Sequence, residues 1–418
     1  WRSLPADRET AVRADWTNEE IAFQAEVRAF FAKALTPEIR RAGSLLTSVY
    51  GDPALSRAWQ RILHDKGWAA PAWPVEHGGC DWTPVQHYIF ARERVAAGAP
   101  PLSPMGVNMV ANVIMRFGTP EQKAYFLPRT LRGDIFWCQG YSEPDAGSDL
   151  AALQMRAEDD GETFVCNGSK IWTTHAHVAD WAFCLVRTST EARLQQGVTF
   201  LLIDMKTPGV EVRPLVMLSG EHIQNQIFFT DARVPKANVL GQIGMGWHVA
   251  KSLLEFERGG TVGSPGLQES VAQLSAVARR TSTGEGMLAD DPDFAAKLAE
   301  AKIRVDAFEA LELRLLAGSR KNVGGAPSMM KLLFTELSQH LTELMLEAAG
   351  LHALPFQPHA AMPGGPVPGF VPPNDGFVAG ETWQAIAPLK YLNDRAATIY
   401  AGSSEIQRNI MTKLVLGL

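Results

Sequence analysis

A run of small, polar and turn-forming residues, from Ser142 to Asp149, could hold a flat or anionic ligand. It follows a short predicted strand and contains two serines, a glycine and a proline. Such a loop can present backbone N–H groups and hydroxyls to a ligand without steric hindrance. Because most loops of this composition are ordinary polar turns at strand ends, the run alone predicts a candidate binding loop and no particular reaction.

Other polar residues give weaker signals. His175 and His177 could place two imidazoles on one side of a strand, but no third ligand is evident, so we expect no metal site. Ser403 and Ser404 lack the His and Asp partners that would indicate a hydrolase. The four cysteines lie far apart without a CxxC pair, which disfavours a zinc knuckle or a disulfide framework and favours a reducing, cytoplasmic location.

Three segments would position these residues. Residues 1–134 are predicted to form a helical domain, with a strong helix start at Thr119–Gln122. Residues 135–245 contain short runs rich in β-branched and aromatic residues, such as Val198–Ile203, and predict a small antiparallel β-domain. Residues 246–418 return to helical periodicity and predict a four-helix-type bundle. The expected fold class is therefore α+β.

Composition excludes several kinds of protein. The chain has 418 residues, of which 46% are hydrophobic and 20% are charged, as in ordinary globular proteins. With 39 Lys and Arg against 45 Asp and Glu, the net charge of −6 gives no positive field for nucleic acid. No apolar run approaches the roughly 18–20 residues of a membrane span, and the first residues show no signal-peptide pattern. We therefore expect neither a nucleic-acid nor a membrane partner.

Three motifs in a fixed order resemble the acyl-CoA dehydrogenase family. Residues 139–149 resemble its first signature, residues 167–174 its flavin-facing strand, and residues 400–408 its second signature near the C-terminus. The resemblance covers nearly the whole chain. It implies the family's order of helical domain, β-domain and helical bundle, bound FAD, and oxidation of an acyl-CoA thioester to the trans-2-enoyl-CoA.

The resemblance also implies a task for each matching side chain. Groups around Tyr141 and Ser142 would hydrogen-bond the polar edge of the flavin, and Trp172 would cover one of its faces. Thr174 would donate a hydrogen bond near N5, where reduction adds electron density. The residues implied to bind the cofactor are Gln139, Tyr141, Ser142, Ser148, Trp172, Thr173, Thr174, Ser403 and Glu405, where the last is acidic although the family often has Gln. Those implied to bind the substrate are Ser148, Arg258 and Gly402.

The expected catalytic base is Glu257. Many family members carry the base immediately before the Gly of the second signature, but here that residue is Ala401, which cannot accept a proton. A subset resembling isovaleryl-CoA dehydrogenase carries it on a helix immediately before an Arg, and the matching pair here is Glu257 and Arg258. Glu255 is about 200° away from Glu257 around a helix, so at most one of them can face the same cleft.

The resemblance leaves the assembly open. The run at residues 82–90 and the last four residues are similar to those of the pimeloyl-CoA dehydrogenase large subunit. Two family segments at the adenosine end of FAD are altered, around residues 278–284 and at 347–351, so the cofactor could be completed by a non-identical partner. The alternatives are a half-site subunit of a heteromeric dehydrogenase and a flavin oxidase or monooxygenase. A homo- or hetero-oligomer and an electron-transferring flavoprotein are the implied partners, and the acyl chain cannot be assigned.

Overall fold

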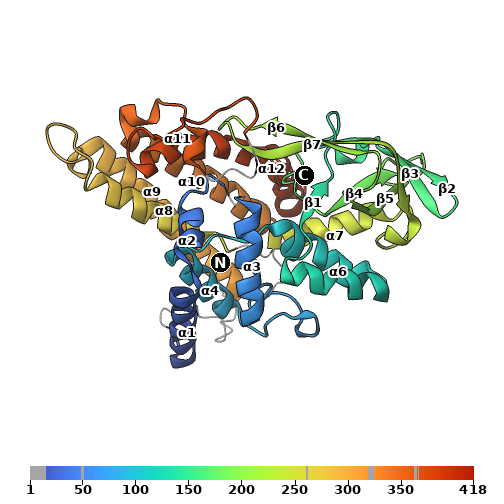
Figure 1. Ribbon diagram of the computed structural model, residues 1–418. Coiled ribbons are helices and arrows are strands. Elements are labelled where there is room, and N and C mark those ends of the chain that lie inside the picture. Colours follow the sequence, from blue (N-terminus) through green and yellow to red (C-terminus); the bar gives the residue numbers. More distant parts are fainter. Residues whose placement is uncertain (1–15, 49–50, 260–261, 319–323, 362–364, 366) are drawn as a thin grey trace.

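A computed structural model describes residues 16–48, 51–259, 262–318, 324–361, 365 and 367–418, and for residues 255–259 it describes the backbone alone. Two helical units flank a β-sheet in the sequence (Figure 1). This order confirms the α+β fold class with a central β-domain.

Reciprocal caps begin several helices of the N-terminal unit. In the first of them the backbone N–H of Thr17 donates to Glu20 Oε2 (2.7 Å), and the N–H of Glu20 donates to Thr17 Oγ1 (3.2 Å). Each cap satisfies backbone donors that the first helical turn leaves free. The helices are α1 (Asn18–Ala34), α2 (Pro37–Ser44), α3 (Pro53–Lys66), α4 (Pro84–Ala96), α5 (Ala111–Phe117) and α6 (Pro120–Arg132), with a π-helix, η2 (Met105–Val110), before α5.

The described part of the β-domain is a seven-stranded sheet. The pairs β2–β3, β3–β7, β6–β7 and β4–β5 are antiparallel, as expected, whereas β1 and β2 pair with β4 in parallel. Strand β4 lies at the centre of the core and is buried along nearly all its length. The strands are β1 (Trp137–Gly140), β2 (Arg156–Asp160), β3 (Thr163–Lys170), β4 (Trp181–Arg187), β5 (Val198–Asp204), β6 (Val210–Val216) and β7 (His222–Pro235).

Arg57 of α3 joins the N-terminal unit to the β-domain. Its guanidinium donates to the carbonyls of Gly133 and Asp134, at 3.2 and 3.3 Å, and lies over the ring of Phe136. It also forms an ion pair with Asp180 (2.9 Å), whose carboxylate accepts the backbone N–H of Phe136. The planar guanidinium carries five N–H donors and can bind several acceptors at once. The connection at residues 133–136 is therefore fixed at Gly133, Asp134 and Phe136.

The C-terminal unit is a helical bundle built around α10, which packs against α8, α9, α11 and α12. A cluster of buried apolar side chains from α8, α9 and α10, including Leu274, Val305 and Leu341, forms its core. The buried carboxylate of Glu312 accepts the backbone N–H groups of Gly263 and Ser264 and fixes the start of α8. The helices are α7 (Gly246–Gly259), α8 (Ser264–Ala278), α9 (Pro292–Ala317), α10 (Ala326–Ala349), α11 (Thr382–Asp394) and α12 (Ser404–Met411).

The three units also meet at a buried carboxyl group, Glu221, directly before β7. Thr47 from the N-terminal unit donates its hydroxyl to Glu221, and Asn393 of α11 donates to the same Thr47 hydroxyl (3.2 Å). Ser219 donates to Glu221 at 2.8 Å.

Among the helices that the structure describes, none is long and apolar enough to cross a membrane.

Candidate functional site

The two motif loops of the β-domain lie against each other. The first begins with Gln139, inside β1, and continues through buried Tyr141 to Ser142. The second begins where β3 ends, and the backbone N–H of Ile171 donates to the carbonyl of Ser142 (2.9 Å). The structure thus brings into contact two loops that carry six of the expected cofactor residues: Gln139, Tyr141, Ser142, Trp172, Thr173 and Thr174.

A buried ion pair lies behind these loops. Lys170, which is fully buried, places its Nζ 2.7 Å from Glu143 Oε1 and 3.1 Å from the carbonyl oxygen of Tyr141. Glu143 also accepts the backbone N–H groups of Gln154 (2.7 Å) and Met155 (3.0 Å). Burial lowers the pKa of Lys170, and the Glu143 carboxylate opposes that shift. Glu143 is therefore a structural carboxylate of the turn and no free acid or base.

The sequence reasoning missed Lys170, although a signal for it was present. Alternate residues of β3 point inward, and both Phe164 and Cys166 are buried. Because side chains alternate along a strand, position 170 belongs to this inward set. A Lys at an inward position requires a buried partner, which here is Glu143.

The Trp172–Thr174 segment has an unusual backbone. Trp172 has φ 58° and its side chain is exposed, with 62% of its surface accessible. Thr173 is fully buried, and its Oγ1 has no hydrogen-bond partner in the described part of the chain. Thr174 accepts a hydrogen bond from Gln224 Nε2 (3.0 Å). A large aromatic residue in the left-handed region is strained, and strain of this kind is typical of binding segments.

Ser148 lies further along the first loop, on an exposed turn. Arg187 fixes the segment that follows, because its guanidinium donates to the carbonyls of Ala151 (2.8 Å) and Leu153 (3.1 Å). Ser148 is thus exposed to solvent, and the backbone that follows it is fixed by hydrogen bonds.

The second signature begins helix α12. Ser403 caps the helix by accepting the N–H of Ile406 (3.4 Å). Glu405 is exposed, and its pKa is lowered by the backbone N–H at the helix start and by the Ser403 hydroxyl. Gly402 has φ 80°, and Ala401 before it has φ 53°. Ser403, Glu405 and Gly402 therefore belong to the C-terminal unit, separate in the sequence from the β-domain loops.

Two buried polar atoms at this helix lack partners. Ser404 Oγ and Gln407 Oε1 make no hydrogen bond within the described residues, although Gln407 Nε2 donates to the carbonyl of Ala401 (3.1 Å). Buried polar groups are almost always paired, so these two atoms are available to bind a ligand.

The expected base lies on α7. Residue 257 occupies the last turn of this helix, and the side chains of Glu257 and Arg258 lie outside the described residues. One turn earlier, Leu253 is fully buried in the same apolar cluster as Tyr141. The helix that carries position 257 is therefore anchored against the core that supports the first loop.

Three histidines lie near the second loop, and two of them are in contact. Burial lowers the pKa of His175 to about 3, which keeps its imidazole neutral, and His177 lies against His222 with ring centroids 4.1 Å apart. In the described part of the chain, no three His, Cys, Asp or Glu side chains are arranged to hold a metal ion.

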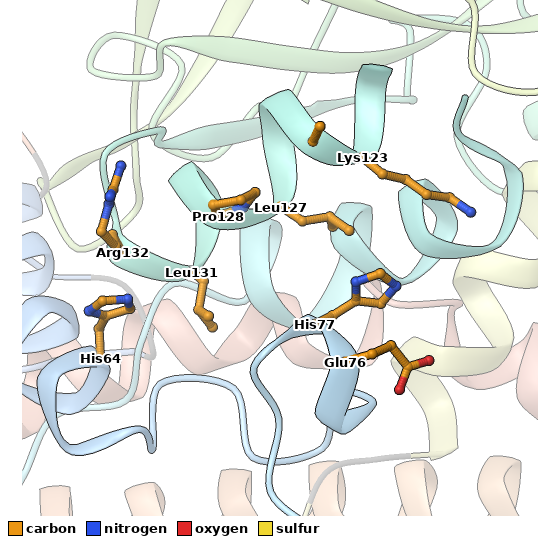
Figure 2. Close-up of a pocket in the computed structure, with 9 residues that line it drawn as sticks. His64, Glu76, His77, Lys123, Leu127, Pro128, Leu131 and Arg132 are labelled. Carbon is orange, nitrogen blue, oxygen red and sulfur yellow. The ribbon is translucent and has the colours of Figure 1, made fainter. Parts of the chain in front are cut away.

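A surface hollow of about 440 Å³ lies elsewhere, on the N-terminal unit (Figure 2). Lys123, Leu127 and Pro128 of α6 line it, together with His64 at the end of α3 and His77 of a short 3-10 helix. None of the expected cofactor or substrate residues lines this hollow, so it is separate from the motif loops.

Comparison with known proteins identifies the family. The models "Acyl-CoA dehydrogenase, N-terminal domain", "middle domain" and "C-terminal domain" match residues 17–134, 138–232 and 244–416. The chain is 36% identical over 408 residues to acyl-CoA dehydrogenase IpdE1 of Mycobacterium tuberculosis, covering 95% of this chain and 97% of the relative. It is 34% identical over 418 residues to IpdE1 of Mycolicibacterium smegmatis, with the same coverage.

Two solved structures are similar over nearly the whole chain. One is the ChsE4-ChsE5 complex from Mycobacterium tuberculosis, with TM-score 0.80, 28% identity, and coverage of 97% of this chain and 99% of the other. The second is the Tcur3481-Tcur3483 steroid ACAD, with TM-score 0.79, 27% identity, and coverage of 98% and 99%. The chain therefore belongs to the acyl-CoA dehydrogenase family of flavin-dependent oxidoreductases.

Proposed function

We propose that this chain binds FAD and catalyses α,β-dehydrogenation of an acyl-CoA thioester to the trans-2-enoyl-CoA, with Glu257 as the acceptor of the α-proton. The observation that carries the proposal is the contact between the two motif loops through Ile171 N–H and Ser142 O. It brings into contact the two loops that carry the candidate flavin residues of the β-domain, and this supports the proposal.

The residues present fit a flavin. Thr173 Oγ1, on the second loop, is a buried polar atom without a described partner, and so are Ser404 Oγ and Gln407 Oε1 at the start of α12. The exposed indole of Trp172 offers a flat apolar face of the size that a ring system requires. Gln139, Tyr141, Ser142, Thr174, Ser403 and Glu405 complete the proposed cofactor set, and Ser148, Arg258 and Gly402 are proposed to contact the substrate.

The chemistry needs one base from the chain. Bound FAD would accept the β-hydride at N5. The α-proton of a thioester is only weakly acidic, so a carboxylate must lie against the α-carbon while the thioester carbonyl is held by hydrogen bonds. Ala401 cannot serve, and Glu257 is the proposed replacement on α7. Covering by the acyl chain would raise the pKa of that carboxyl group and make it a stronger base once substrate is bound.

Flavin bleaching by a panel of acyl-CoAs tests this assignment. Straight-chain, dicarboxylic, branched, alicyclic and steroid-derived thioesters are mixed with the holoenzyme without oxygen, and absorbance near the flavin maximum is recorded. We expect Glu257→Gln to retain FAD and lose bleaching, whereas Glu255→Gln, about 200° around the same helix, keeps it. Unchanged bleaching in Glu257→Gln would refute the base.

A second candidate is a half-site subunit of a heteromeric dehydrogenase. Two observations favour it: the altered adenosine-end segments at residues 278–284 and 347–351, and the similarity to a solved complex of two chains, ChsE4 and ChsE5. In the second segment, Gly350 has a backbone φ of 54°, and the next residue, Leu351, is highly exposed. FAD that binds only after a non-identical partner chain is added would favour this form.

The electron acceptor distinguishes a dehydrogenase from a flavin oxidase or monooxygenase. We propose an electron-transferring flavoprotein as the oxidant of the reduced enzyme, within a homo- or hetero-oligomer. An oxidase or monooxygenase on the same scaffold would instead be reoxidised rapidly by molecular oxygen, so stopped-flow mixing of the reduced enzyme with oxygen separates the two.

A further inference from the structure

We propose that the ion pair between Lys170 and Glu143 is a positioning element for the flavin. It would set the relative position of the two flavin-facing loops and direct one backbone N–H toward the cofactor. The inference rests on the proposed function, because that function assigns these loops to FAD. Neither side chain is proposed to touch the reacting atoms.

The pair joins three separate segments. Lys170 is the last residue of β3, directly before the Ile171–Thr174 loop. Glu143 lies in the first loop, which is closed by reciprocal hydrogen bonds between the backbones of Glu143 and Ala146, both 3.0 Å. The remaining lone pairs of the Glu143 carboxylate hold the backbone at Gln154 and Met155. Neither loop can move relative to the other without separating two buried charges.

The same lysine orients a peptide group. Its Nζ donates to the carbonyl of Tyr141 at 3.1 Å, inside the protein. The Tyr141 carbonyl and the Ser142 N–H belong to one planar trans peptide, so they point in opposite directions. The Ser142 N–H has no acceptor among the described residues, and it is therefore left to donate to a ligand. A fixed N–H donor stabilises electron density that builds up on its acceptor.

The lysine stem packs against Gly140. A Cβ built on Gly140 would lie 2.4 Å from Cys184 Sγ and 3.4 Å from Lys170 Cγ, so the stem passes over a position where only glycine fits. Burial raises the pKa of Cys184 to about 12, which keeps its thiol neutral. Glu143 is thus the carboxylate that balances the ammonium, and the Tyr141 carbonyl is its second acceptor.

The test uses the holoenzyme, with its partner chain if FAD binding requires one. The variants are Lys170→Met, Glu143→Gln and the double variant. The matched control is Lys236→Met, because Lys236, which is partly exposed, forms an ion pair of 2.6 Å with the exposed Asp159 in the same domain. Three quantities are measured for each: the FAD dissociation constant, the bleaching rate at saturating FAD and substrate, and the unfolding midpoint.

The double variant separates positioning from stability. It buries no charge, so we expect it to recover most of the unfolding midpoint that Lys170→Met loses. Its FAD dissociation constant should still rise about tenfold and its bleaching should slow, because the Tyr141 carbonyl has lost a charged donor. Lys236→Met should match the wild type in FAD affinity and bleaching rate, with only a small change in the unfolding midpoint. Should Lys170→Met not fold, the double variant alone decides.

Two results would overturn the inference. One is a double variant whose FAD affinity and bleaching rate stay within twofold of the wild type. The other is a wild type that binds no FAD either alone or with a partner chain, which overturns the proposed function as well. A wild type that binds FAD but is bleached by no acyl-CoA contradicts only the proposed reaction, and FAD affinity then still decides the positioning role.

Discussion

Two buried glutamates of the β-domain, Glu143 and Glu221, have opposite surroundings. Glu143 faces an ammonium group and two backbone N–H donors. Glu221 is fully buried and faces the hydroxyls of Thr47 and Ser219, and no described Lys, Arg or His forms an ion pair with it. Burial raises the pKa of Glu221, so its neutral form is favoured relative to an exposed carboxyl group.

The comparison shows that burial alone does not set the role of a carboxyl group. A cation and backbone donors stabilise the charged form, which is suited to fixing a loop beside a ligand. Hydroxyl groups, which can both donate and accept, suit either protonation state. Glu221 accordingly joins three units without a balancing charge, and because its pKa is raised by burial, its contribution to stability should depend on pH.

The largest expected effect follows from removing the cation of the first site. Lys170→Met leaves Glu143 buried and unpaired, which should reduce the free energy of unfolding by about 3–5 kcal/mol. Urea unfolding followed by tryptophan fluorescence measures it. A loss below about 1 kcal/mol would mean that water reaches Glu143 and that the two sites differ less than the structure indicates.

Neutralising each glutamate in turn sharpens the contrast. At pH 7, Glu143→Gln should cost about 2–3 kcal/mol, because hydrogen bonds to a charged group are lost and Lys170 is left unpaired. Glu221→Gln should cost much less, since an amide can accept from the same hydroxyls. Equal losses in the two variants, measured side by side by urea unfolding, would remove the distinction.

The pH dependence of stability tests the state of Glu221. A carboxyl group whose pKa is higher in the folded than in the unfolded chain binds more protons when folded, so it stabilises at low pH. Stability should then fall as the pH rises from about 4.3, the ordinary Glu value, through the raised pKa, by up to about 1.4 kcal/mol per pH unit. Glu221→Gln should lack this component, and identical pH profiles of unfolding for the variant and the wild type would contradict the raised pKa.

The smallest effect is expected at the ion pair between the partly exposed Lys236 and the exposed Asp159. Lys236→Met breaks the ion pair with Asp159 and should change the free energy of unfolding by less than about 1 kcal/mol, because solvent screens exposed charges. Added salt should reduce even that difference. A loss as large as that of Lys170→Met would show that the exposed pair is tied to a wider network.

Local patterns were enough to predict the order of the units and the motif loops. Helix caps such as Thr17 with Glu20 depend on residues three apart, and strand alternation along β3 depends on residues two apart. The partners of Glu221 could not be found in this way, because Thr47 is 174 residues distant. The parallel neighbours of β4 were missed for the same reason, since pairing across a sheet depends on contacts between distant segments.

In the candidate site, too, local features could be predicted from the sequence, whereas contacts between distant segments could not. The loss of an acid at position 401 was visible from one residue, and the structure adds that Ala401 adopts a left-handed backbone. That Ile171 would meet Ser142 depended on how two loops pack, which no spacing in the sequence specifies. The burial of Lys170 could have been inferred from strand alternation, but its partner Glu143 could not.

The Arg57 connection has a consequence for how the molecule can be divided. Its guanidinium donates to the carbonyls of Gly133 and Asp134 within the junction at residues 133–136 and to the carbonyl of Val178 in the β-domain, so this short stretch is a poor substrate for a protease and a poor hinge. Limited digestion should spare it and nick other connections first. If the first two units are produced as separate polypeptides, neither would carry a complete set of partners for Arg57, and they should behave well only when refolded together.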